Sequence, residues 1–464
     1  MKSTKQKFHK TVVIDVVGLS QSILSQYTPF LNGYLEKRNK TYIKPMLPAV
    51  TTSVQSTYLT GKWPNEHGIV GNGWYDRSDS EIKFWKQSNH LVVGEKIWER
   101  AKKIDPGFTC AKMFWWYNMY SSADYSVTPR PQYHADGVKT PDCYSNPPEL
   151  RDELQKKFGQ FPLFHFWGPN ANIKSTKWIK DATLYVDRKY NPTLSLVYLP
   201  HLDYGLQKYG NDTNKLKKEL LELDEVLKEL ITYYESQKTK VVILSEYGIS
   251  NVSTPIHINR ILRENQLLEV RRERWYEHLD PGASKAFSVS DHQVAHIYCK
   301  DASVVQKVKQ IAKQIKGVDL VLDKNEQKRF QLNHSRSGDL VLVSKDGFWF
   351  TYYYWLNEKN APDYARLVDI HRKPGYDPAE LFLDPKKKMA KLRVILTLLR
   401  KKLGFRYLMD FIPLDATLVR GSHGRIPENL DFYPILSTEI PLPKKEISAI
   451  KVYDFIWDQM TTKI

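Results

Sequence analysis

The sequence predicts an α/β fold in which helices flank a mostly parallel central sheet. Three short and almost continuously apolar segments, residues 11–17, 193–199 and 240–244, predict strands that are buried on both faces. The amphipathic segment 215–237 predicts a helix directly before the third strand, which makes a strand–helix–strand unit. An acidic residue lies at or just beyond the end of each strand. We therefore expect three carboxylates at the sheet edge where open α/β sheets bind ligands: Asp15, Asp203 and Glu246.

The first predicted strand is followed by a turn that is rich in hydroxyl groups. Residues 48–71 read PAVTTSVQSTYLTGKWPNEHGIVG, and the hydroxyl residues Thr51, Thr52 and Ser53 begin an expected helix. A hydroxyl that binds a cation loses its proton near neutral pH and becomes a nucleophile. Taken alone, such a turn is more often a helix cap, so a purely structural turn is the alternative.

Residues 74–191 are rich in Trp, Tyr and Pro, as in MFWWYNMY at 113–120. We interpret this stretch as an insertion of aromatic loops and short helices that lies over the site. Its aromatic side chains either pack in the core or form a stacking wall for a planar group of a substrate. No clear linker or repeat interrupts the sequence, so residues 1–464 are expected to form a single catalytic domain.

A second set of elements follows from residue 288. The predicted elements are a strand at 289–299, a helix at 304–316, a strand at 319–322, and a hairpin of 339–344 with 348–355. Together with a basic helix that comes next, they predict a basic helical or cap segment at about 320–412 within the domain.

The formal net charge is +17, and much of it lies in one segment. Residues 386–406 contain nine Lys or Arg residues and no acid. Apolar residues recur there on one helical face: Leu392, Ile395, Leu396, Leu399 and Leu403. One interpretation is a core-packed helix with a solvated basic face. The other is peripheral contact with an anionic membrane, or binding of a phosphate-rich ligand. The sequence contains no zinc-finger, RNA-binding or helix-turn-helix pattern, so we expect no nucleic-acid partner.

The remaining global features favour a cytoplasmic location. No stretch of about 18 uncharged apolar residues indicates a membrane span. The basic, polar start MKSTKQKFHK lacks the apolar region of a signal peptide. Cys110, Cys143 and Cys299 are odd in number and scattered, so we expect inert thiols in a reducing compartment.

Five motifs with acids, hydroxyls or histidines occur in a fixed order along the chain. They are Asp15 at a strand end; Pro48 and Thr51 with Thr60-Gly61 and Pro64–Val70; Asp203 with Lys208-Tyr209-Gly210; Ser245–Gly248; and His423 before Gly424. This order and spacing resembles the alkaline phosphatase superfamily, specifically its nucleotide pyrophosphatase/phosphodiesterase branch. The resemblance extends from about residue 11 to 425.

The resemblance implies an alkaline-phosphatase-like fold and hydrolysis of a phosphodiester or pyrophosphate through a phosphothreonine at Thr51. It implies a small phosphate-containing substrate and two divalent ions, with zinc first and manganese or magnesium as alternatives. No other cofactor is implied. The implied metal ligands are Asp15, Thr51, Asp203, Glu246 and His423, with His201, Gln207 and Tyr247 as further candidates.

Three of these positions depart from the pattern of the family. Gln207, Glu246 and Tyr247 stand where the family has His, Asp and His. A donor set with less nitrogen shifts the preference from zinc toward manganese or magnesium. The departures also leave open a catalytically weak or inactive binding homologue, and hydrolysis of phosphomonoesters or phosphonates is a further alternative.

Other histidines are candidates to replace the missing imidazoles. His201 would point to the same side as Asp203 if the segment were extended. His257 and the pair Asp291-His292 are also candidates, whereas we interpret His67 as structural.

Overall fold

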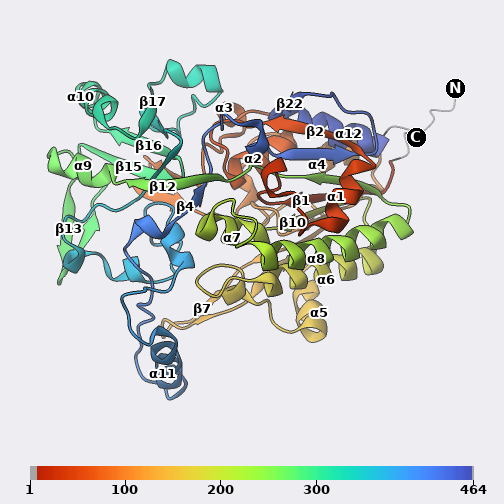
Figure 1. Ribbon diagram of the computed structural model, residues 1–464, viewed down its shortest axis with the longest axis horizontal. Coiled ribbons are helices and arrows are strands. Elements are labelled where there is room, and N and C mark those ends of the chain that lie inside the picture. The colour runs from red at the N-terminus through yellow and green to blue at the C-terminus, as the bar shows by residue number, and fades with distance from the viewer. Residues whose placement is uncertain (1–7, 462–464) are drawn as a thin grey trace.

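The computed structural model describes residues 8–461, and the larger of its two main sheets is nine-stranded (Figure 1). In spatial order this sheet contains β22 (Glu446–Ser448), β2 (Asn39–Lys44), β21 (Ile435–Thr438), β11 (Lys240–Leu244), β1 (Thr11–Val16), β10 (Leu194–Leu199), β5 (Cys110–Met113), β6 (Tyr125–Pro129) and β9 (Cys143–Asn146).

The three strands predicted from the sequence are confirmed as the centre of this sheet. β1 pairs in parallel with β10 on one side and with β11 on the other. Every residue of β1 and β10 is buried, which explains why their sequences are apolar on both faces. The pairs β10–β5 and β5–β6 are also parallel, whereas β11–β21 and β6–β9 are antiparallel. The prediction of a mostly parallel sheet is therefore confirmed.

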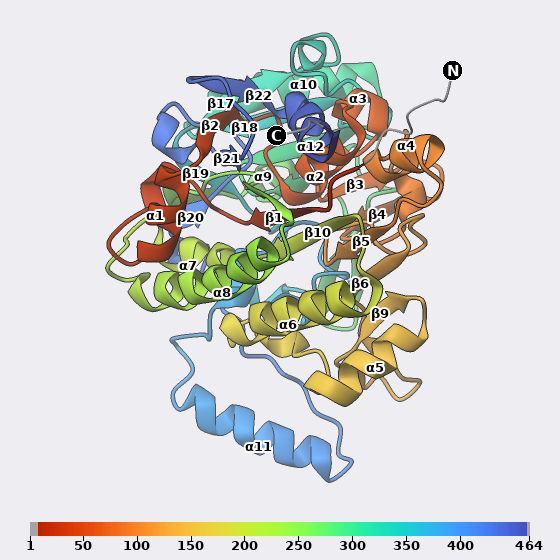
Figure 2. The same ribbon diagram turned by 90° about the vertical axis from the view of Figure 1, so that its right-hand side faces the viewer.

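Helices cover both faces of the large sheet (Figure 2). On one face lie α6 (Ile173–Tyr190), α7 (His201–Tyr209) and α8 (Lys217–Ser236), and on the other α2 (Thr51–Thr60), α4 (Ile97–Ile104) and α12 (Val452–Thr461). The predicted helix at 215–237 is α8, whose buried leucines and valine face the core. The helices α1 (Pro29–Glu36), α3 (Pro64–His67) and α5 (Glu149–Phe158) lie at the periphery.

A second sheet, antiparallel and four-stranded, has its own hydrophobic core. Its order is β15 (Ala286–Asp291), β16 (Val294–Cys299), β18 (Leu340–Ser344) and β17 (Val318–Leu322), with α9 (Ile258–Glu264) and α10 (Ala302–Gln314) packed against it. A third, three-stranded sheet contains β19 (Gly347–Phe350), β12 (Ser250–Ile256) and β20 (Gly421–Ser422), with β12 in the middle. The two-stranded ribbons are β3 (Gly73–Asp76) with β4 (Glu81–Phe84), β7 (Gln132–Tyr133) with β8 (Lys139–Thr140), and β13 (Val270–Glu273) with β14 (Tyr276–Leu279).

Residues 74–191 are not an insertion that only lies over the site, as the sequence led us to expect. Three short strands in this stretch, β5, β6 and β9, extend the central sheet. They are only four or five residues long and lie between aromatic loops, so their apolar pattern is difficult to recognise.

Two predictions for the second half of the chain are also wrong. The single strand expected at 289–299 is the hairpin β15–β16, which turns at His292 with a φ of 60°. The hairpin expected at 339–355 does not form, because β18 pairs with β16 and β17, whereas β19 pairs with β12. Residues 320–412, expected to form a basic helical or cap segment within the domain, thus also contribute β17 and β18 to the second sheet.

The basic helix α11 (Ala390–Lys402) projects away from the body of the molecule (Figures 1 and 2). None of its described side chains is buried, so the interpretation of a core-packed helix is wrong.

No helix in residues 8–461 is long and apolar enough to cross a membrane. The three cysteines are buried and form no disulfide with one another.

Candidate functional site

The carboxyl ends of the central strands bring most of the predicted site residues together. Asp15 lies near the end of β1, Glu246 follows β11, and Asp203 lies in the first turn of α7, which follows β10. Thr51 is the first residue of α2 and reaches the same edge. The sheet topology therefore produces the site that the acidic strand ends predicted.

Thr51 is the hydroxyl residue that faces the pocket at this edge. Its Oγ1 lies 3.0 Å from the Tyr247 hydroxyl oxygen. The neighbouring Thr52 has a structural role, because its hydroxyl donates to the Gly71 carbonyl and its backbone N–H donates to Asn72 Oδ1. The backbone amide of Thr52 is thus already engaged in a hydrogen bond.

Asp15 and Glu246 form a buried carboxylate pair that a side-chain amide bridges. Gln55 Nε2 donates to Glu246 Oε1 at 2.6 Å and to Asp15 Oδ2 at 3.3 Å. The Trp116 backbone N–H donates to Gln55 Oε1 at 2.7 Å, so the amide group points toward the carboxylates. Burial raises the pKa of both carboxyl groups. Asp15 Oδ1 and Glu246 Oε2 are buried without a hydrogen-bond partner among the described residues.

Gln55 was not predicted from the sequence, although a signal for it exists. It lies four residues after Thr51, so both side chains project from the same face of α2. The helix therefore presents an amide to the carboxylate pair and a hydroxyl to Tyr247.

Asp203 lies in a second hydrogen-bonded group beside the carboxylate pair. Gln207 Nε2 donates to Asp203 Oδ2 at 2.7 Å, and the Tyr376 hydroxyl donates to Gln207 Oε1 at 2.9 Å. Burial raises the pKa of Asp203 to about 7, although Gln207 and the Tyr247 hydroxyl oppose this effect. Tyr376 was missed by the sequence analysis because it comes from a distant loop that carries no local motif.

Four aromatic rings form a continuous column along one side of the site. Tyr247 stacks on His423 with ring centres 3.5 Å apart, His423 lies 3.7 Å from His292, and His292 lies 3.7 Å from Tyr376. His423 Nδ1 lies 2.8 Å from the Ala49 carbonyl oxygen, which requires that this nitrogen carries the proton. The bare Nε2 of His423 is buried and has no partner among the described residues. Burial lowers the pKa of His423 to about 3.

Two of the other candidate residues do not reach the site. His201 does not join Asp203, because the segment is helical and residues two apart on a helix point in different directions. Its nearest acid is Glu222, at 3.9 Å on α8. His257 lies 2.8 Å from the Thr351 hydroxyl on another part of the fold. Of the candidate pair Asp291-His292, Asp291 accepts hydrogen bonds from the backbone and side chain of Asn72, whereas His292 lines the pocket and belongs to the aromatic column.

His67 is engaged at both ring nitrogens within the turn that follows α2. Its Nε2 lies 3.0 Å from the Thr57 hydroxyl, and its Nδ1 accepts from the Ile69 backbone N–H at 3.0 Å. No ring nitrogen is left to bind a metal, which agrees with the interpretation of a structural residue.

The buried His67 makes a testable contribution to acid sensitivity. Burial lowers its pKa from 6.5 to about 3. The unfolded chain therefore binds a proton below about pH 6.5 that the folded protein excludes, so stability falls as the pH falls through this range. At pH 5 the cost is about 2 kcal/mol for this residue. Urea unfolding between about pH 7 and pH 5 should show a shallower pH slope in His67→Gln.

His134, which is exposed on the β7–β8 ribbon, offers a matched control for this experiment. The variant His134→Gln is expected to keep the slope of the wild type. An unchanged slope in His67→Gln would contradict the assignment of a buried neutral imidazole.

The pocket above Thr51 has a volume of about 150 Å³ and is lined mainly by aromatic side chains. Its polar lining includes Thr51, Asp203 and Tyr247, and its walls include Trp85, Trp116, Phe166, Trp167 and Tyr376. Trp115, in contrast, is fully buried in the core. The aromatic stretch at 74–191 therefore supplies both core packing and part of a stacking wall.

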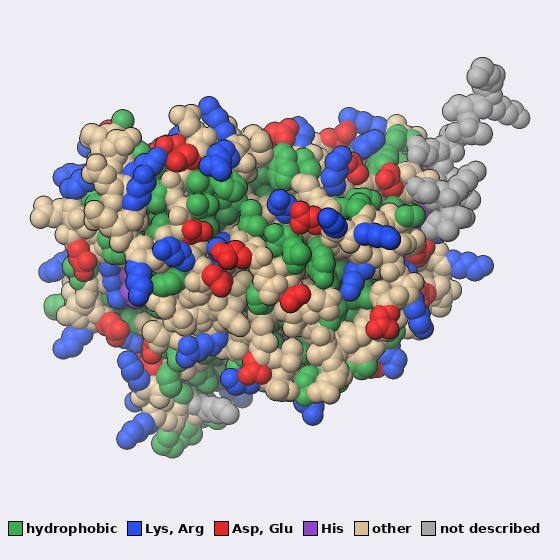
Figure 3. Space-filling model, turned by 45° about the horizontal axis from the view of Figure 1, so that its top comes forward, with side chains coloured by type: hydrophobic (Ala, Val, Ile, Leu, Met, Phe, Trp, Pro, Cys, Tyr) green, Lys and Arg blue, Asp and Glu red, His purple; other side chains and the backbone are tan. Residues whose placement is uncertain are grey.

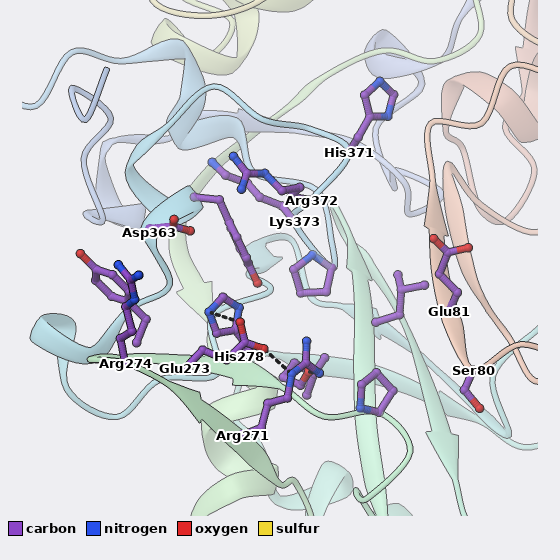
Figure 4. A pocket seen from close by; sticks show the side chains of 16 residues that line it. Ser80, Glu81, Arg271, Glu273, Arg274, His278, Asp363, His371, Arg372 and Lys373 are labelled. Atoms are coloured by element: carbon purple, nitrogen blue, oxygen red, sulfur yellow. Dashed lines mark hydrogen bonds and ion pairs between the residues drawn. The ribbon is translucent and has the colours of Figure 1, made fainter. Parts of the chain in front are cut away.

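A larger pocket of about 660 Å³ lies elsewhere, between β13–β14 and the loop around Arg372 (Figure 4). Most of its charged groups are already paired. Glu273 accepts from Arg271 Nε at 2.7 Å and lies 3.7 Å from His278. Lys373 contacts Asp377 at 2.7 Å. It contains none of the predicted catalytic or metal-binding residues, so we take the smaller pocket as the candidate site.

The donor atoms of the site fit one oxygen-coordinated ion better than two zinc ions. In residues 8–461, no three His, Cys, Asp or Glu side chains gather closely enough to hold a metal. Asp15 and Glu246 nevertheless leave two buried carboxylate oxygens without partners among the described residues, at the sheet edge that Thr51 also reaches. Two carboxylates completed by substrate phosphate oxygens and water are a donor set typical of Mg²⁺.

The second expected metal site is not supported by its donors. Asp203 and His423 each have one free atom, but both side-chain atoms of Gln207 are already engaged. A zinc site needs at least three protein ligands. His201, which would have been a third ligand, lies elsewhere. His292 Nδ1 is also buried without a partner among the described residues, but His292 does not complete a group of three ligands with Asp203 and His423.

Comparisons with known proteins agree with the motif order. The family model described as type I phosphodiesterase / nucleotide pyrophosphatase matches residues 11–377. Ectonucleotide pyrophosphatase/phosphodiesterase 1 of Saccharomyces cerevisiae is 24% identical over 322 residues, which cover 62% of this chain and 40% of that protein. Ectonucleotide pyrophosphatase/phosphodiesterase 2 of the same yeast is 23% identical over 270 residues, which cover 52% of this chain and 48% of that protein. The chain thus spans less than half the length of these relatives.

Solved structures share the fold at low sequence identity. Murine ectonucleotide pyrophosphatase / phosphodiesterase 5 superposes with a TM-score of 0.57 at 13% identity, covering 98% of this chain and 96% of the other. Phosphonoacetate hydrolase from Sinorhizobium meliloti 1021 superposes with a TM-score of 0.60 at 15% identity, covering 97% and 95%.

Proposed function

The chain belongs to the type I phosphodiesterase / nucleotide pyrophosphatase family, within the alkaline phosphatase superfamily, and we propose that it hydrolyses a phosphodiester or pyrophosphate bond in a small molecule. The observation that carries this proposal is the position of Thr51. Its hydroxyl begins α2, faces an aromatic pocket, and lies at the sheet edge that holds the Asp15–Glu246 pair. A complex of an inactive variant of the murine protein with AMP is consistent with a substrate of this chemical class.

In the proposed reaction Thr51 Oγ1 attacks phosphorus and displaces the ester or anhydride oxygen, which leaves a phosphothreonine. Tyr247 holds the nucleophile in place through the 3.0 Å contact between their hydroxyl oxygens. The Tyr247 hydroxyl also neighbours Asp203, whose pKa of about 7 suits it to accept the Thr51 proton along this path. Water then releases the phosphoryl group, and the bare His423 Nε2 can accept a hydrogen bond from that water.

Divalent ions are part of the proposal, because this family consists of metal-dependent hydrolases. Asp15, Glu246 and Thr51 would hold one ion, and such an ion supplies charge neutralisation at the phosphate and a lower pKa for the Thr51 hydroxyl. The donor set supports magnesium or manganese at this position. Zinc and a second ion follow from the family resemblance and have weaker support from these residues.

A panel of chromogenic substrates tests the proposed activity. Purified protein with Mg²⁺ or Mn²⁺ is expected to cleave a phosphodiester faster than a phosphomonoester or a phosphonate, and a chelator should abolish turnover. The rate of release of the coloured product with each substrate and metal is the measurement. Faster cleavage of the monoester or phosphonate would assign the chain to one of those alternative activities.

Metal binding by the folded protein can be measured without turnover. Mg²⁺ or Mn²⁺ is expected to raise the Tm of the wild type, because a ligand that binds only the folded state stabilises it. Asp15→Asn should lose this shift, whereas Asp203→Asn should retain it. A larger shift with Zn²⁺ that disappears in Asp203→Asn would instead place the ion at Asp203 and His423.

A specific observation favours a second candidate function, binding without catalysis. The Gln55 amide already lies between the two carboxylates, where a cation would otherwise neutralise them. Tight binding of phosphate esters in the pocket, with no turnover of any substrate at any metal, would support this function.

A further inference from the structure

The helix α11 presents a large apolar surface to solvent. Ile395 is 54% exposed and Leu403, directly after the helix, is 72% exposed. Other large apolar side chains of the segment are also exposed: Met389, Leu392, Leu396, Leu398, Leu399, Phe405 and Leu408. A soluble surface normally exposes such residues singly, so a continuous group of them indicates a surface that binds something apolar.

The same segment is strongly basic. Residues 386–406 carry nine Lys or Arg residues and no acid. Lys387 pairs with Asp410 at 2.6 Å, but Arg400, Lys401 and Lys402 form no ion pair with any described residue. Figure 3 shows hydrophobic and basic side chains gathered on the projection at the lower left, where Figure 1 places α11.

Together, these two properties distinguish between the possible partners. A nucleic acid would be attracted by the charge but would leave the leucines exposed. Packing against another protein surface would bury the leucines but would not use this excess of positive charge. The interface of an anionic bilayer satisfies both properties, since acyl chains receive the apolar residues and acidic headgroups neutralise the basic ones.

We propose that residues 386–408, with α11 at their centre, dock the protein peripherally on an anionic lipid bilayer. The helix lies in the plane of the interface with its leucine face toward the acyl chains. The chain that leads to α11 also supplies Val368, Ile370 and Tyr376 to the pocket above Thr51, so the docked segment is continuous with a wall of the site. The docking proposal does not depend on the hydrolase activity.

Vesicle co-sedimentation tests the proposal with the full chain. The wild type is expected to sediment with vesicles of equal parts phosphatidylglycerol and phosphatidylcholine at low salt, and to remain in solution with pure phosphatidylcholine. The variant L396S/L399S and the variant R400E/K401E/K402E should each lower the bound fraction roughly tenfold or more. High salt should weaken binding of the wild type.

Matched controls on other helices separate docking from general surface effects. Leu221→Ser removes an exposed leucine from α8, and K307E/K313E reverses two exposed lysines on α10. Both variants should sediment like the wild type. Circular dichroism and Tm identify any variant that fails to fold. If one of the two α11 variants does not fold, the other is compared with the wild type.

Three results would overturn the proposal. The first is failure of the wild type to sediment with the anionic vesicles at low salt. The second is equal sedimentation of L396S/L399S and wild type, together with equal binding of both to a soluble polyanion such as RNA, which would make the segment a polyanion site. The third is a dimer in solution that L396S/L399S dissociates, combined with no binding to vesicles, which would make it a self-association surface.

Discussion

Replacing Thr51 by valine is expected to lower kcat/KM for phosphodiesters by roughly a thousandfold or more, because the variant removes the atom that attacks phosphorus. Valine has nearly the shape of threonine, and the side chain of residue 51 is buried, so the fold should persist. Thr51→Ser keeps a hydroxyl and should retain part of the activity. Steady-state kinetics, with Tm measured for each variant, provide the test.

Thr60 lies on the same helix and offers a matched control for this substitution. Its hydroxyl donates to the Ser56 carbonyl at 2.7 Å and does not line the pocket. Thr60→Val should therefore retain wild-type kinetics, apart from a small loss of stability. Full activity in Thr51→Val would exclude Thr51 as the nucleophile.

The second large effect is expected at Glu246, where activity and stability should change in opposite directions. Glu246→Gln should lower turnover roughly a hundredfold or more, because the site loses half of its anionic donor pair. The same change should stabilise the metal-free protein by about 1–3 kcal/mol, since it removes a buried carboxylate that has an unpartnered oxygen.

The pH dependence of this stabilisation has a definite sign. Burial raises the pKa of Glu246 above its ordinary value of 4.5, so the unfolded chain loses its proton first as the pH rises. The cost of the carboxylate therefore grows with pH above about 4.5, and the gain in Glu246→Gln should grow with it. Urea unfolding of metal-free protein at several pH values measures this effect.

Asp224 provides the contrasting control. It is also a buried carboxylate, but its two oxygens accept backbone N–H groups of Phe30 and Leu31 at 2.9 Å each. Asp224→Asn should destabilise the protein, because one of these donors loses its acceptor. If Glu246→Gln also destabilised the metal-free protein, the buried Glu246 carboxylate would not carry the free-energy cost that we expect.

The elements predicted well from the sequence are those with a regular burial pattern. β1, β10 and β11 are buried on both faces, and α8 alternates between core and solvent, so each has a clear local pattern. The strands β5, β6 and β9 are short and form only through pairing with a distant strand. The hairpin β15–β16 has the sequence pattern of a single strand, because its turn is made by a histidine in a conformation that few non-glycine residues adopt.

The site was predictable to the extent that the sheet topology determines it. Asp15, Thr51 and Asp203 reach the same edge because they follow neighbouring parallel strands or begin the helices there. The bridging Gln55 and the column that ends at Tyr376 depend on side-chain packing between segments far apart in the chain. The prediction that His201 points to the same side as Asp203 is wrong because it assumed an extended segment, whereas α7 begins at His201.

The stereochemical course at phosphorus tests the central claim most directly. Attack by Thr51 followed by attack of water inverts the configuration twice, so a diester that is chiral at phosphorus through isotopic or sulfur substitution should give a product with retained configuration. Inversion would mean that water attacks the substrate directly, and it would contradict the proposed phosphothreonine at Thr51.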